Sequence, residues 1–288
     1  MYLVFFLEAT PLAFVVVAIC LGLIVGSFLN VVIHRLPIML EREWQSHCTE
    51  LNGGTAAVAE PYNLVVPRSR CPHCGHAISA LENIPVLSYL LLRGRCRACG
   101  ARISPRYLVI ELISGILSGW LAWHFGFGSP ALGALLLTWA LLALAAIDLE
   151  KQLLPDKITL PVLWLGLLFN LGHTFTDPRS ALIGAVAGYL SLWCVYHAFK
   201  LLTGKEGMGY GDFKLFALLG AWLGWQNLPL IILIAAATGA LAGIGLILGH
   251  RAQRGIPIPF GPYLAVAGWI ALLWGPQITR AYLGLMGA

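Results

Sequence analysis

The sequence is poor in charged residues. Asp, Glu, Lys and Arg make up 11% of its 288 residues, hydrophobic residues make up 59%, and the mean hydropathy is +0.81. About a quarter of the residues of a soluble domain are charged, so this composition excludes an ordinary soluble domain and indicates a polytopic membrane protein. The formal net charge of +5 is unevenly distributed along the chain, which argues against a nucleic-acid partner.

Two further absences narrow the class. No Lys or Arg precedes the first apolar run, and no small-residue cleavage site follows it. We therefore expect residues 12–32 to form a permanent membrane span and not a signal peptide that is removed. The sequence also lacks a G-x-G-x-x-G motif, so a Rossmann-type cofactor site cannot be recognised.

Several apolar segments approach the roughly 20 residues that a membrane helix needs. The predicted fold is therefore all-α, with about eight transmembrane helices embedded in lipid. The sixth segment is short, and only the break at residues 226–229 divides it from the seventh, so a tilted short helix and part of a re-entrant hairpin are both open. The predicted segments are residues 10–33, 106–124, 130–148, 157–173, 181–202, 213–226, 228–249 and 261–274.

The basic residues predict the orientation of these helices. With the N-terminus outside, sixteen of the eighteen Lys and Arg residues lie in inside loops, and only Arg179 and Arg280 lie outside. Because positive charge collects on the cytoplasmic side of membrane proteins, we expect both termini to be outside. Three domains follow: a first transmembrane helix (1–33), a small cytoplasmic domain (34–105) and a transmembrane domain (106–288).

Two carboxylates stand at the same predicted membrane face. Asp148 ends the third apolar segment, and Asp212 opens the sixth behind Gly209 and Gly211. A carboxylate beside hydrocarbon is costly and marks a functional site by default. Asp212 alone could be a capping residue, but the helix dipole disfavours an acid at a C-terminus, so Asp148 needs another reason to be there. We predict one acid–base pair.

Two other acids have simpler interpretations. Asp156 follows Pro155 at a predicted helix start, where Asp is a preferred N-cap, although a supporting electrostatic role is an alternative. Glu111 lies in the second apolar segment, about one turn past Arg106. An internal ion pair and a substrate contact are both open for it.

The predicted cytoplasmic domain contains two C-x-x-C-G knuckles, 21 residues apart. Paired knuckles of this kind supply four thiolates to a structural zinc ion. The cytoplasm is reducing and disfavours disulfides. Redox pairs and unliganded thiols are the alternatives to a zinc site. His73 and His76 are possible substitute ligands. The predicted ligands are Cys71, Cys74, Cys96 and Cys99.

These motifs together resemble the type IV prepilin peptidases, also called leader peptidase/N-methyltransferases, which are membrane aspartic proteases of the G-x-G-D type. One departure is visible, because the family often has a proline where this chain has Leu108. The departure concerns the start of a helix and not the chemistry. The resemblance rests on Asp148 and on residues 26–37, 67–74, 83–85, 92–99, 154–156 and 209–212.

The resemblance implies a bifunctional enzyme of the bacterial inner membrane. Such enzymes cleave the leader of type IV prepilins and type II secretion pseudopilins after a glycine, on the cytoplasmic side. They then methylate the new N-terminal residue with S-adenosylmethionine. The family's catalytic aspartates correspond to Asp148 and Asp212, and its metal ligands correspond to the four knuckle cysteines.

The site of the methyl donor is a separate hypothesis. We place S-adenosylmethionine on the cytoplasmic domain near Arg93, Gly94 and Arg95. Rival classes are a presenilin-like protease, a proton-coupled transporter and a non-catalytic pilus or secretion assembly protein. The first would have a tyrosine before the first aspartate and a Pro-Ala-Leu motif, whereas Ile147 precedes Asp148 here and that motif is absent. A transporter would keep its carboxylates near the membrane midplane.

Overall fold

The computed structural model describes residues 2–54, 61–79, 81–248 and 259–285. Within these ranges the secondary structure is helical, with two isolated β-bridges and no β-strand. The chain divides into two compact units, Met1–Phe127 and Gly128–Ala288. The predicted all-α architecture is therefore confirmed for the described part of the chain.

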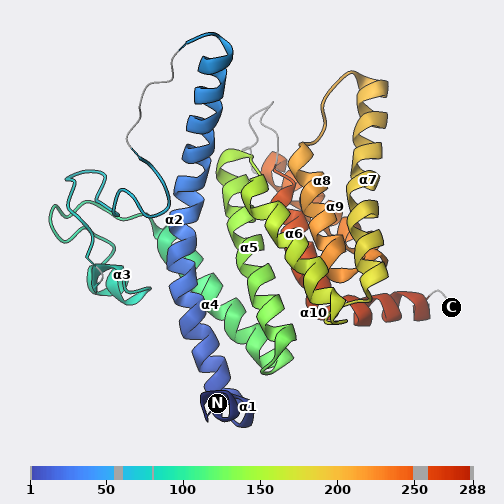
Figure 1. Cartoon of the computed structure of the whole chain (residues 1–288), viewed down its shortest axis with the longest axis horizontal. Coiled ribbons are helices and arrows are strands. Elements are labelled where there is room, and N and C mark those ends of the chain that lie inside the picture. The colour runs from blue at the N-terminus through green and yellow to red at the C-terminus, as the bar shows by residue number, and fades with distance from the viewer. Residues whose placement is uncertain (1, 55–60, 80, 249–258, 286–288) are drawn as a thin grey trace. The chain divides into compact units, whose positions relative to one another are not determined.

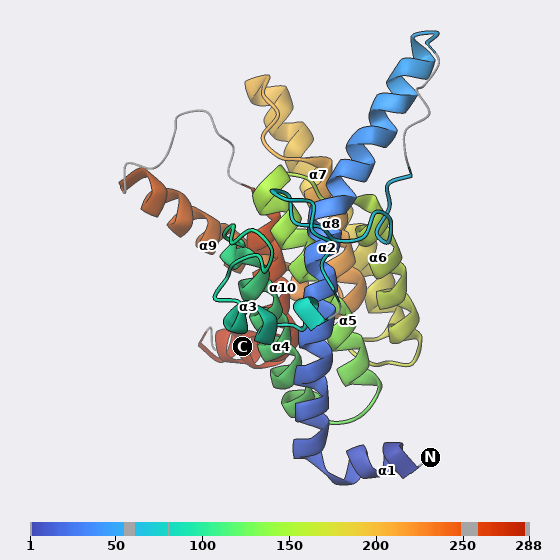
Figure 2. The ribbon, with the colours of Figure 1, turned by 90° about the vertical axis from the view of Figure 1, so that its left-hand side faces the viewer.

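Unit one is built on two long helices that lie side by side over part of their length (Figures 1 and 2). Small residues bring their backbones together: a Cβ added to Gly26 would lie 2.8 Å from Cα of Glu111. Ser114 Oγ donates a hydrogen bond to the Gly22 carbonyl at 2.6 Å. Close helix packing through small residues is typical of membrane helices. The elements of this unit are α1 (Tyr2–Ala9), α2 (Pro11–Leu51), η1 (Leu81–Asn83), α3 (Leu87–Leu91) and α4 (Pro105–Phe125).

Helix α2 runs well beyond the predicted span of residues 10–33. It contains Pro37 and ends only at Leu51. Pro37 removes one backbone hydrogen bond, but good helix formers such as Leu40, Glu41 and Arg42 follow it and allow the helix to continue. Apolar length therefore did not predict where this helix ends. Helix α4 begins at Pro105 with Ser104 as its N-cap, so Leu108 does not disturb its start.

Unit two surrounds one buried helix, α8, in which eleven of fourteen residues are buried. Helices α6, α7 and α10 pack against it. A helix that is apolar and buried all round belongs to a protein core. The elements of this unit are α5 (Ser129–Lys151), α6 (Asp156–Leu171), α7 (Pro178–Thr203), α8 (Tyr210–Leu223), η2 (Trp225–Asn227), α9 (Leu228–Leu248) and α10 (Gly261–Leu285).

The contact between α7 and α8 is made backbone to backbone. A Cβ added to Gly188 would lie 2.7 Å from the Phe216 carbonyl oxygen, and Gly184 and Gly220 approach each other just as closely. At the far end of α8, the buried amide of Asn170 donates hydrogen bonds to the carbonyls of Ala221 and Trp222, both at 2.9 Å. These contacts fix α8 along its length and thereby fix its first turn.

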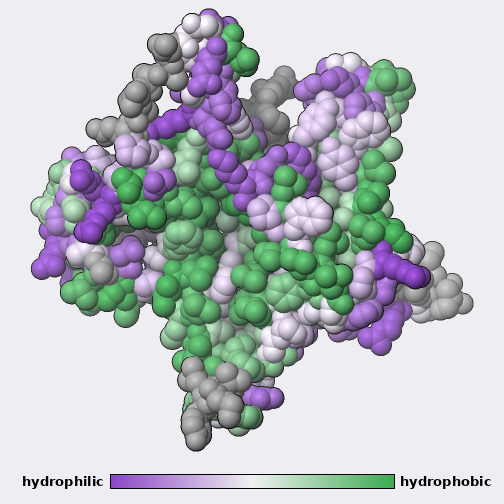
Figure 3. Space-filling view, in the orientation of Figure 1, coloured by the Kyte–Doolittle hydropathy of each residue, from purple (hydrophilic) through white to green (hydrophobic). Residues whose placement is uncertain are grey.

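Five helices in the described residues are long and apolar enough to cross a membrane, which makes this a membrane protein. Each of the eight predicted apolar segments overlaps a helix, and the uncertain break at 226–229 is real, because η2 separates α8 from α9. Figure 3 shows that the visible outer faces of α5 and α6 are apolar along their middle, while hydrophilic residues gather where α5 ends and α6 begins. The five spans are Pro11–Leu51, Pro105–Phe125, Ser129–Lys151, Pro178–Thr203 and Trp225–Gly245.

We predict that Gly220→Ala destabilises unit two. The added methyl group would meet the backbone of Gly184, and overpacking of this kind costs about 1–3 kcal/mol. The matched control is Gly245→Ala in α9, where an added Cβ has no neighbour within 4 Å. Thermal unfolding in detergent should show a lower melting temperature for Gly220→Ala only, and equal melting temperatures for both variants would contradict the prediction.

Candidate active site and metal cluster

Asp148 lies in the last turn of α5 and is 6% exposed. The helix ends one turn later because Gln152 adopts a left-handed conformation with φ 52°. One oxygen of the carboxylate, Oδ2, accepts a hydrogen bond from the backbone N–H of Gly261 at 3.0 Å. Asp148 is therefore oriented by the first residue of α10, 113 positions further along the chain.

Asp212 is the third residue of α8 and is 8% exposed. Its Oδ1 atom is buried and has no hydrogen-bond partner among the described residues. The carboxylates of Asp148 and Asp212 interact electrostatically. The C-terminus of α5 and the N-termini of α8 and α10 lie at the same end of unit two (Figure 1), so the structure brings the two predicted aspartates into one site.

Leu154 packs against the start of α8 and the start of α10, beside both aspartates. A Cβ added to Gly211 would lie 2.7 Å from Cβ of Leu154, and one added to Gly261 would lie 3.2 Å from its Cδ2. Glycine at 211 is thus required by the approach of Leu154. Gly209 is different, because an added Cβ there would meet only Asp212 Oδ2 at 3.7 Å and Gly211 N at 4.0 Å, so space beside it remains for a substrate backbone.

An ion pair joins the start of α6 to the start of α8. Lys214 Nζ lies 2.7 Å from Asp156 Oδ2 and 2.8 Å from its Oδ1. The interpretation of Asp156 as an N-cap is wrong, because Pro155 is the N-cap and Asp156 is the first helical residue. The supporting electrostatic role is the one that the geometry favours.

Aromatic side chains support the first turn of α8. The ring of Tyr210 lies 5.4 Å from that of Tyr196 and 5.3 Å from that of Phe213. Lys200 Nζ lies 2.7 Å from Glu206 Oε1 and joins the end of α7 to the loop before α8. The Lys200 ammonium is also the main cause of the lowered pKa of Glu206. These contacts hold the loop that presents Gly209 and Asp212.

Gly261 contributes a hydrogen bond to the site that the sequence did not indicate. Pro257, Pro259 and the run Phe260-Gly261-Pro262 predict a break in the chain, for which a helix boundary is the favoured interpretation and a rigid wall of the active site is the alternative. It is that boundary, since α10 begins at Gly261. It also forms a wall of the site through its N–H group. Pro257, part of the same predicted break, lies outside the described residues.

In unit one, the sulfur atoms of the four knuckle cysteines all lie within 4.8 Å of one another. The Sγ atoms of Cys71 and Cys99 are 3.8 Å apart, and those of Cys74 and Cys96 are 4.0 Å apart. Zn–S bonds of about 2.3 Å in a tetrahedron place the sulfurs about 3.8 Å apart. The four cysteines could therefore hold a metal ion without rearrangement.

The two knuckles repeat one backbone pattern. Gly75 and Gly100 have φ of 71° and 72°, and their N–H groups bond to the carbonyls of Cys71 and Cys96, each at 2.9 Å. An antiparallel bridge closes each knuckle, between Arg70 and Ala77 in the first and between Arg95 and Arg102 in the second. The glycine after each second cysteine is thus required by a positive φ.

Backbone N–H groups also affect the thiols. Those of Cys74 and His73 lower the pKa of Cys71 to about 7, and those of Cys99 and Ala98 lower the pKa of Cys96. The N–H of His76 acts in the same direction on Cys74, but desolvation and the neighbouring thiols outweigh it and raise the pKa of Cys74 to about 11. A bound divalent cation would supply the remaining charge needed to ionise all four thiols.

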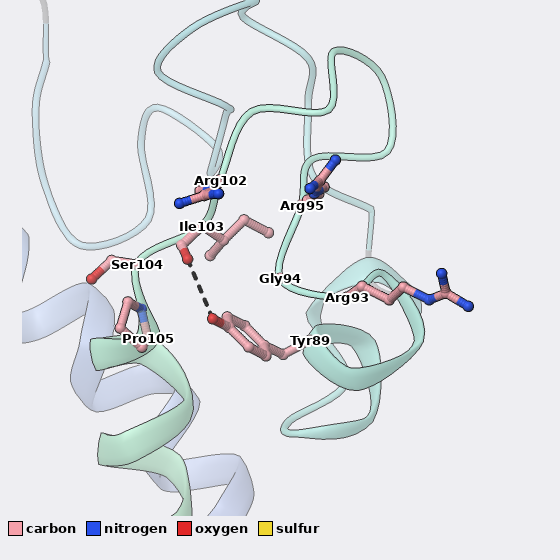
Figure 4. Close-up of a pocket in the computed structure, with 8 residues that line it drawn as sticks. All are labelled: Tyr89, Arg93, Gly94, Arg95, Arg102, Ile103, Ser104 and Pro105. Carbon is pink, nitrogen blue, oxygen red and sulfur yellow. Dashed lines mark hydrogen bonds between the residues drawn. The ribbon is translucent and has the colours of Figure 1, made fainter.

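A cavity of about 440 Å³ opens beside the second knuckle. Figure 4 shows the Tyr89 ring pointing toward Ile103, with Arg95 and Arg102 beyond Gly94 and Ile103 and the Arg93 side chain pointing away. Tyr89 OH donates to the Ile103 carbonyl at 3.4 Å. Gly94 has φ 65°, and an added Cβ would lie 2.9 Å from the Tyr89 ring. The residues predicted to bind the methyl donor therefore line one cavity.

Glu111 has a partner that neither sequence interpretation foresaw. Its side chain is buried within α4, and Oε2 accepts a hydrogen bond from the backbone N–H of Val86 at 2.8 Å.

The fold and the site define a helical membrane protein with a buried pair of carboxylates and a four-cysteine cluster. Residues 20–125 match the family model for the bacterial peptidase A24 N-terminal domain, and residues 135–244 match the type IV leader peptidase family. The chain belongs to the type IV leader peptidase family. No solved structure matches it.

Curated relatives with the name prepilin leader peptidase/N-methyltransferase align over nearly the whole chain, as three of them illustrate. The relative from Stutzerimonas stutzeri is 60% identical over 96% of both chains. The one from Aeromonas hydrophila is 63% identical over 91% of both chains. The one from Pseudomonas aeruginosa strain PAO1 is 57% identical over 98% of both chains.

We predict that Gly261→Ala impairs the chemistry of the aspartate pair. The added methyl group would lie 2.6 Å from Asp148 Oδ2 and would displace that carboxylate. Displacing a catalytic group by about 1 Å can cost about 100-fold in rate, so we expect peptide cleavage to fall at least tenfold. Gly239→Ala is the control, because its Cβ would meet only the Tyr263 ring at 3.4 Å. Equal cleavage rates for the two variants would exclude the proposed geometry.

Proposed function

We propose that this protein cleaves the leader peptide of type IV prepilins and of type II secretion pseudopilins after a glycine, and then N-methylates the new N-terminal residue. The observation that supports the first activity best is the buried pair of Asp148 and Asp212 at one end of unit two. The family and the names of its close relatives support both activities.

Asp148 and Asp212 would catalyse hydrolysis as a pair that shares one proton, because two adjacent carboxylates cannot readily both ionise. The ionised member takes a proton from water, whose oxygen attacks the scissile carbonyl carbon. The protonated member donates its proton to the leaving nitrogen as the C–N bond breaks. The pair titrates as a unit, so neither aspartate has a fixed acid or base role.

The membrane arrangement that we propose has about eight spans with both termini outside. Helices α6 and α8 have only 16 and 14 residues. We include them as short spans because other helices pack around α8 and cover it. The hydrophilic end of unit two then faces the cytoplasm, in the bacterial inner membrane, where the leader of a prepilin lies. The domains would be a first transmembrane helix (1–33), a cytoplasmic metal-binding domain (34–105) and a transmembrane peptidase domain (106–288).

The metal in the cysteine cluster would be a structural zinc ion. Four sulfur ligands at tetrahedral spacing with no open position are typical of structural zinc sites. The second knuckle ends in the bridge between Arg95 and Arg102, and both residues line the cavity. Zinc would therefore stabilise this domain and keep the cavity in shape.

The methyl donor, S-adenosylmethionine, would bind in the cavity beside Tyr89. The residues fit its chemistry: arginine guanidinium groups suit its carboxylate, and the Tyr89 ring offers a face for the adenine or for the sulfonium cation. When bound, it would supply the methyl group for transfer to the amine of the cleaved substrate. Arg93, whose side chain points away from the cavity, contributes only through its backbone (Figure 4).

We predict that Asp148→Asn and Asp212→Asn abolish leader cleavage. Asn keeps the shape of Asp and removes the titrating acid, and loss of general acid–base catalysis costs about 100-fold to 10,000-fold. Purified enzyme and prepilin, analysed by mass spectrometry, should show cleavage after the leader glycine by the wild type only. An added methyl mass on its product would establish the second activity.

The matched control for these variants is Asp177→Asn. Asp177 is exposed and caps α7 by accepting from the N–H groups of Arg179 and Ser180. Asn is an equally good N-cap, so this variant should cleave at the wild-type rate. Normal cleavage by either Asp148→Asn or Asp212→Asn would refute the aspartic protease mechanism.

We also predict that the wild type contains about one zinc ion per chain and that Cys71→Ser loses it, because a structural site rarely survives the loss of one thiolate. Cys194→Ser, which changes an exposed cysteine on α7, should keep the metal. Elemental analysis of the purified proteins measures both. Full zinc content in Cys71→Ser would contradict the four-sulfur site, and loss of zinc in His73→Ala would point to a substitute ligand.

A further inference from the structure

Glu111 is a carboxylate that the proposed chemistry does not use. It is 8% exposed and lies in α4, within a candidate membrane span. Gly26 in α2 packs closely against it, because a Cβ added to Gly26 would lie 2.8 Å from Cα of Glu111. Burying a carboxylate is expensive unless it is hydrogen-bonded, and the bond it accepts comes from the N–H of Val86.

Val86 is held in a conformation that its side chain disfavours. Its φ is 62° and its ψ is −51°, and the Leu87 N–H bonds to the Pro85 carbonyl across it at 2.6 Å. A γ-turn with positive φ is rare and strained, above all for a β-branched residue. Such strain persists only where surrounding contacts impose it. The bond to Glu111 is a contact of this kind.

The strained turn is the N-cap of α3, which carries Tyr89. The segment after α3 contains Arg93 and Gly94, both with positive φ, and the Gly94 N–H bonds to the Tyr89 carbonyl at 2.8 Å. Tyr89 and Gly94 form one wall of the cavity, and residues 103–105, leading into α4, form another. Hydrogen bonds from Tyr89 OH and to the Gly94 carbonyl join the first wall to Ile103, and the anchor at Val86 adds the contact that ties this wall to the body of α4.

We propose that Glu111 is a positioning residue for this cavity: by accepting the Val86 N–H, it ties α3 to α4 and sets the distance between Tyr89 and the start of α4. The role depends on an acceptor oxygen and not on negative charge. This inference rests on the proposed binding of S-adenosylmethionine in the cavity.

The test compares Glu111→Gln, which keeps an acceptor oxygen, with Glu111→Met, which has a similar volume and no acceptor oxygen. The full-length protein in detergent is used. Hydrogen–deuterium exchange of the Val86 amide measures the anchor directly. The dissociation constant for S-adenosylmethionine reports whether the cavity keeps its shape. The prepilin cleavage rate reports whether the rest of the protein remains folded.

For Glu111→Met we expect at least tenfold faster exchange at Val86 and about tenfold weaker donor binding, with cleavage within twofold of the wild type. A hydrogen bond to a carboxylate is strong enough to produce changes of this size. Glu111→Gln should stay within about threefold of the wild type in both measurements. Ser114→Ala is the matched control, because it removes a buried hydrogen bond from α4 to Gly22 and leaves Val86 untouched. Neither the exchange rate at Val86 nor the dissociation constant for S-adenosylmethionine should change.

Unchanged exchange at Val86 in Glu111→Met would overturn the anchor. Equal defects in Glu111→Gln and Glu111→Met would show that charge is required, and equal defects in Ser114→Ala would show a general packing effect; both overturn the proposal. Failure of the donor site itself is distinguishable. In that case the wild type binds no S-adenosylmethionine, or Gly94→Ala binds it normally although its new Cβ would meet Tyr89. Either result would overturn the role of Glu111 in donor binding, whereas hydrogen–deuterium exchange at Val86 would still test the hydrogen bond to Glu111.

Discussion

The burial of two carboxyl groups in one site is the constraint on which unit two depends. An ionised carboxylate would lose several kcal/mol of solvation in an apolar setting, so protein and not lipid must surround Asp212. Helix α8 meets this demand because it is buried on all sides. Its 14 residues span only about 21 Å, and glycine contacts draw the backbone of α7 against it. The core of the unit is thus arranged to hold one acid in place.

The two proposed chemistries would lie in different compact units. The aspartates belong to unit two, and the cysteine cluster and the cavity belong to unit one. Within unit one, the second knuckle places Arg95 and Arg102 at the cavity, so a metal held by the cysteines would help to shape the cavity. Under this proposal, proteolysis and methylation should respond to different substitutions, since the contacts described for each set of groups lie within its own unit.

The sequence was sufficient for features that depend on local pattern. Apolar length located the helices, the C-x-x-C-G spacing predicted the cluster of four cysteines that could hold a metal, and the cost of a carboxylate near lipid predicted the pair of Asp148 and Asp212. It was insufficient for contacts between distant segments. No local pattern indicates that Gly261 donates to Asp148 or that Val86 donates to Glu111, because backbone N–H groups leave no signature in a sequence. Asp156 was misjudged because its partner, the side chain of Lys214, lies 58 positions away in the sequence.

A common device underlies the contacts that the sequence did not reveal. Asp148 and Glu111 each accept a hydrogen bond from the backbone of a remote segment, which satisfies the buried charge and fixes a loop against a helix. A backbone donor cannot be lost by most substitutions, so it suits a contact on which geometry depends. Asp212 departs from this pattern, because its Oδ1 has no partner among the described residues. The pair is therefore asymmetric: a remote backbone donor orients Asp148, whereas Oδ1 of Asp212 keeps hydrogen-bonding capacity that would serve the water and peptide of the proposed reaction.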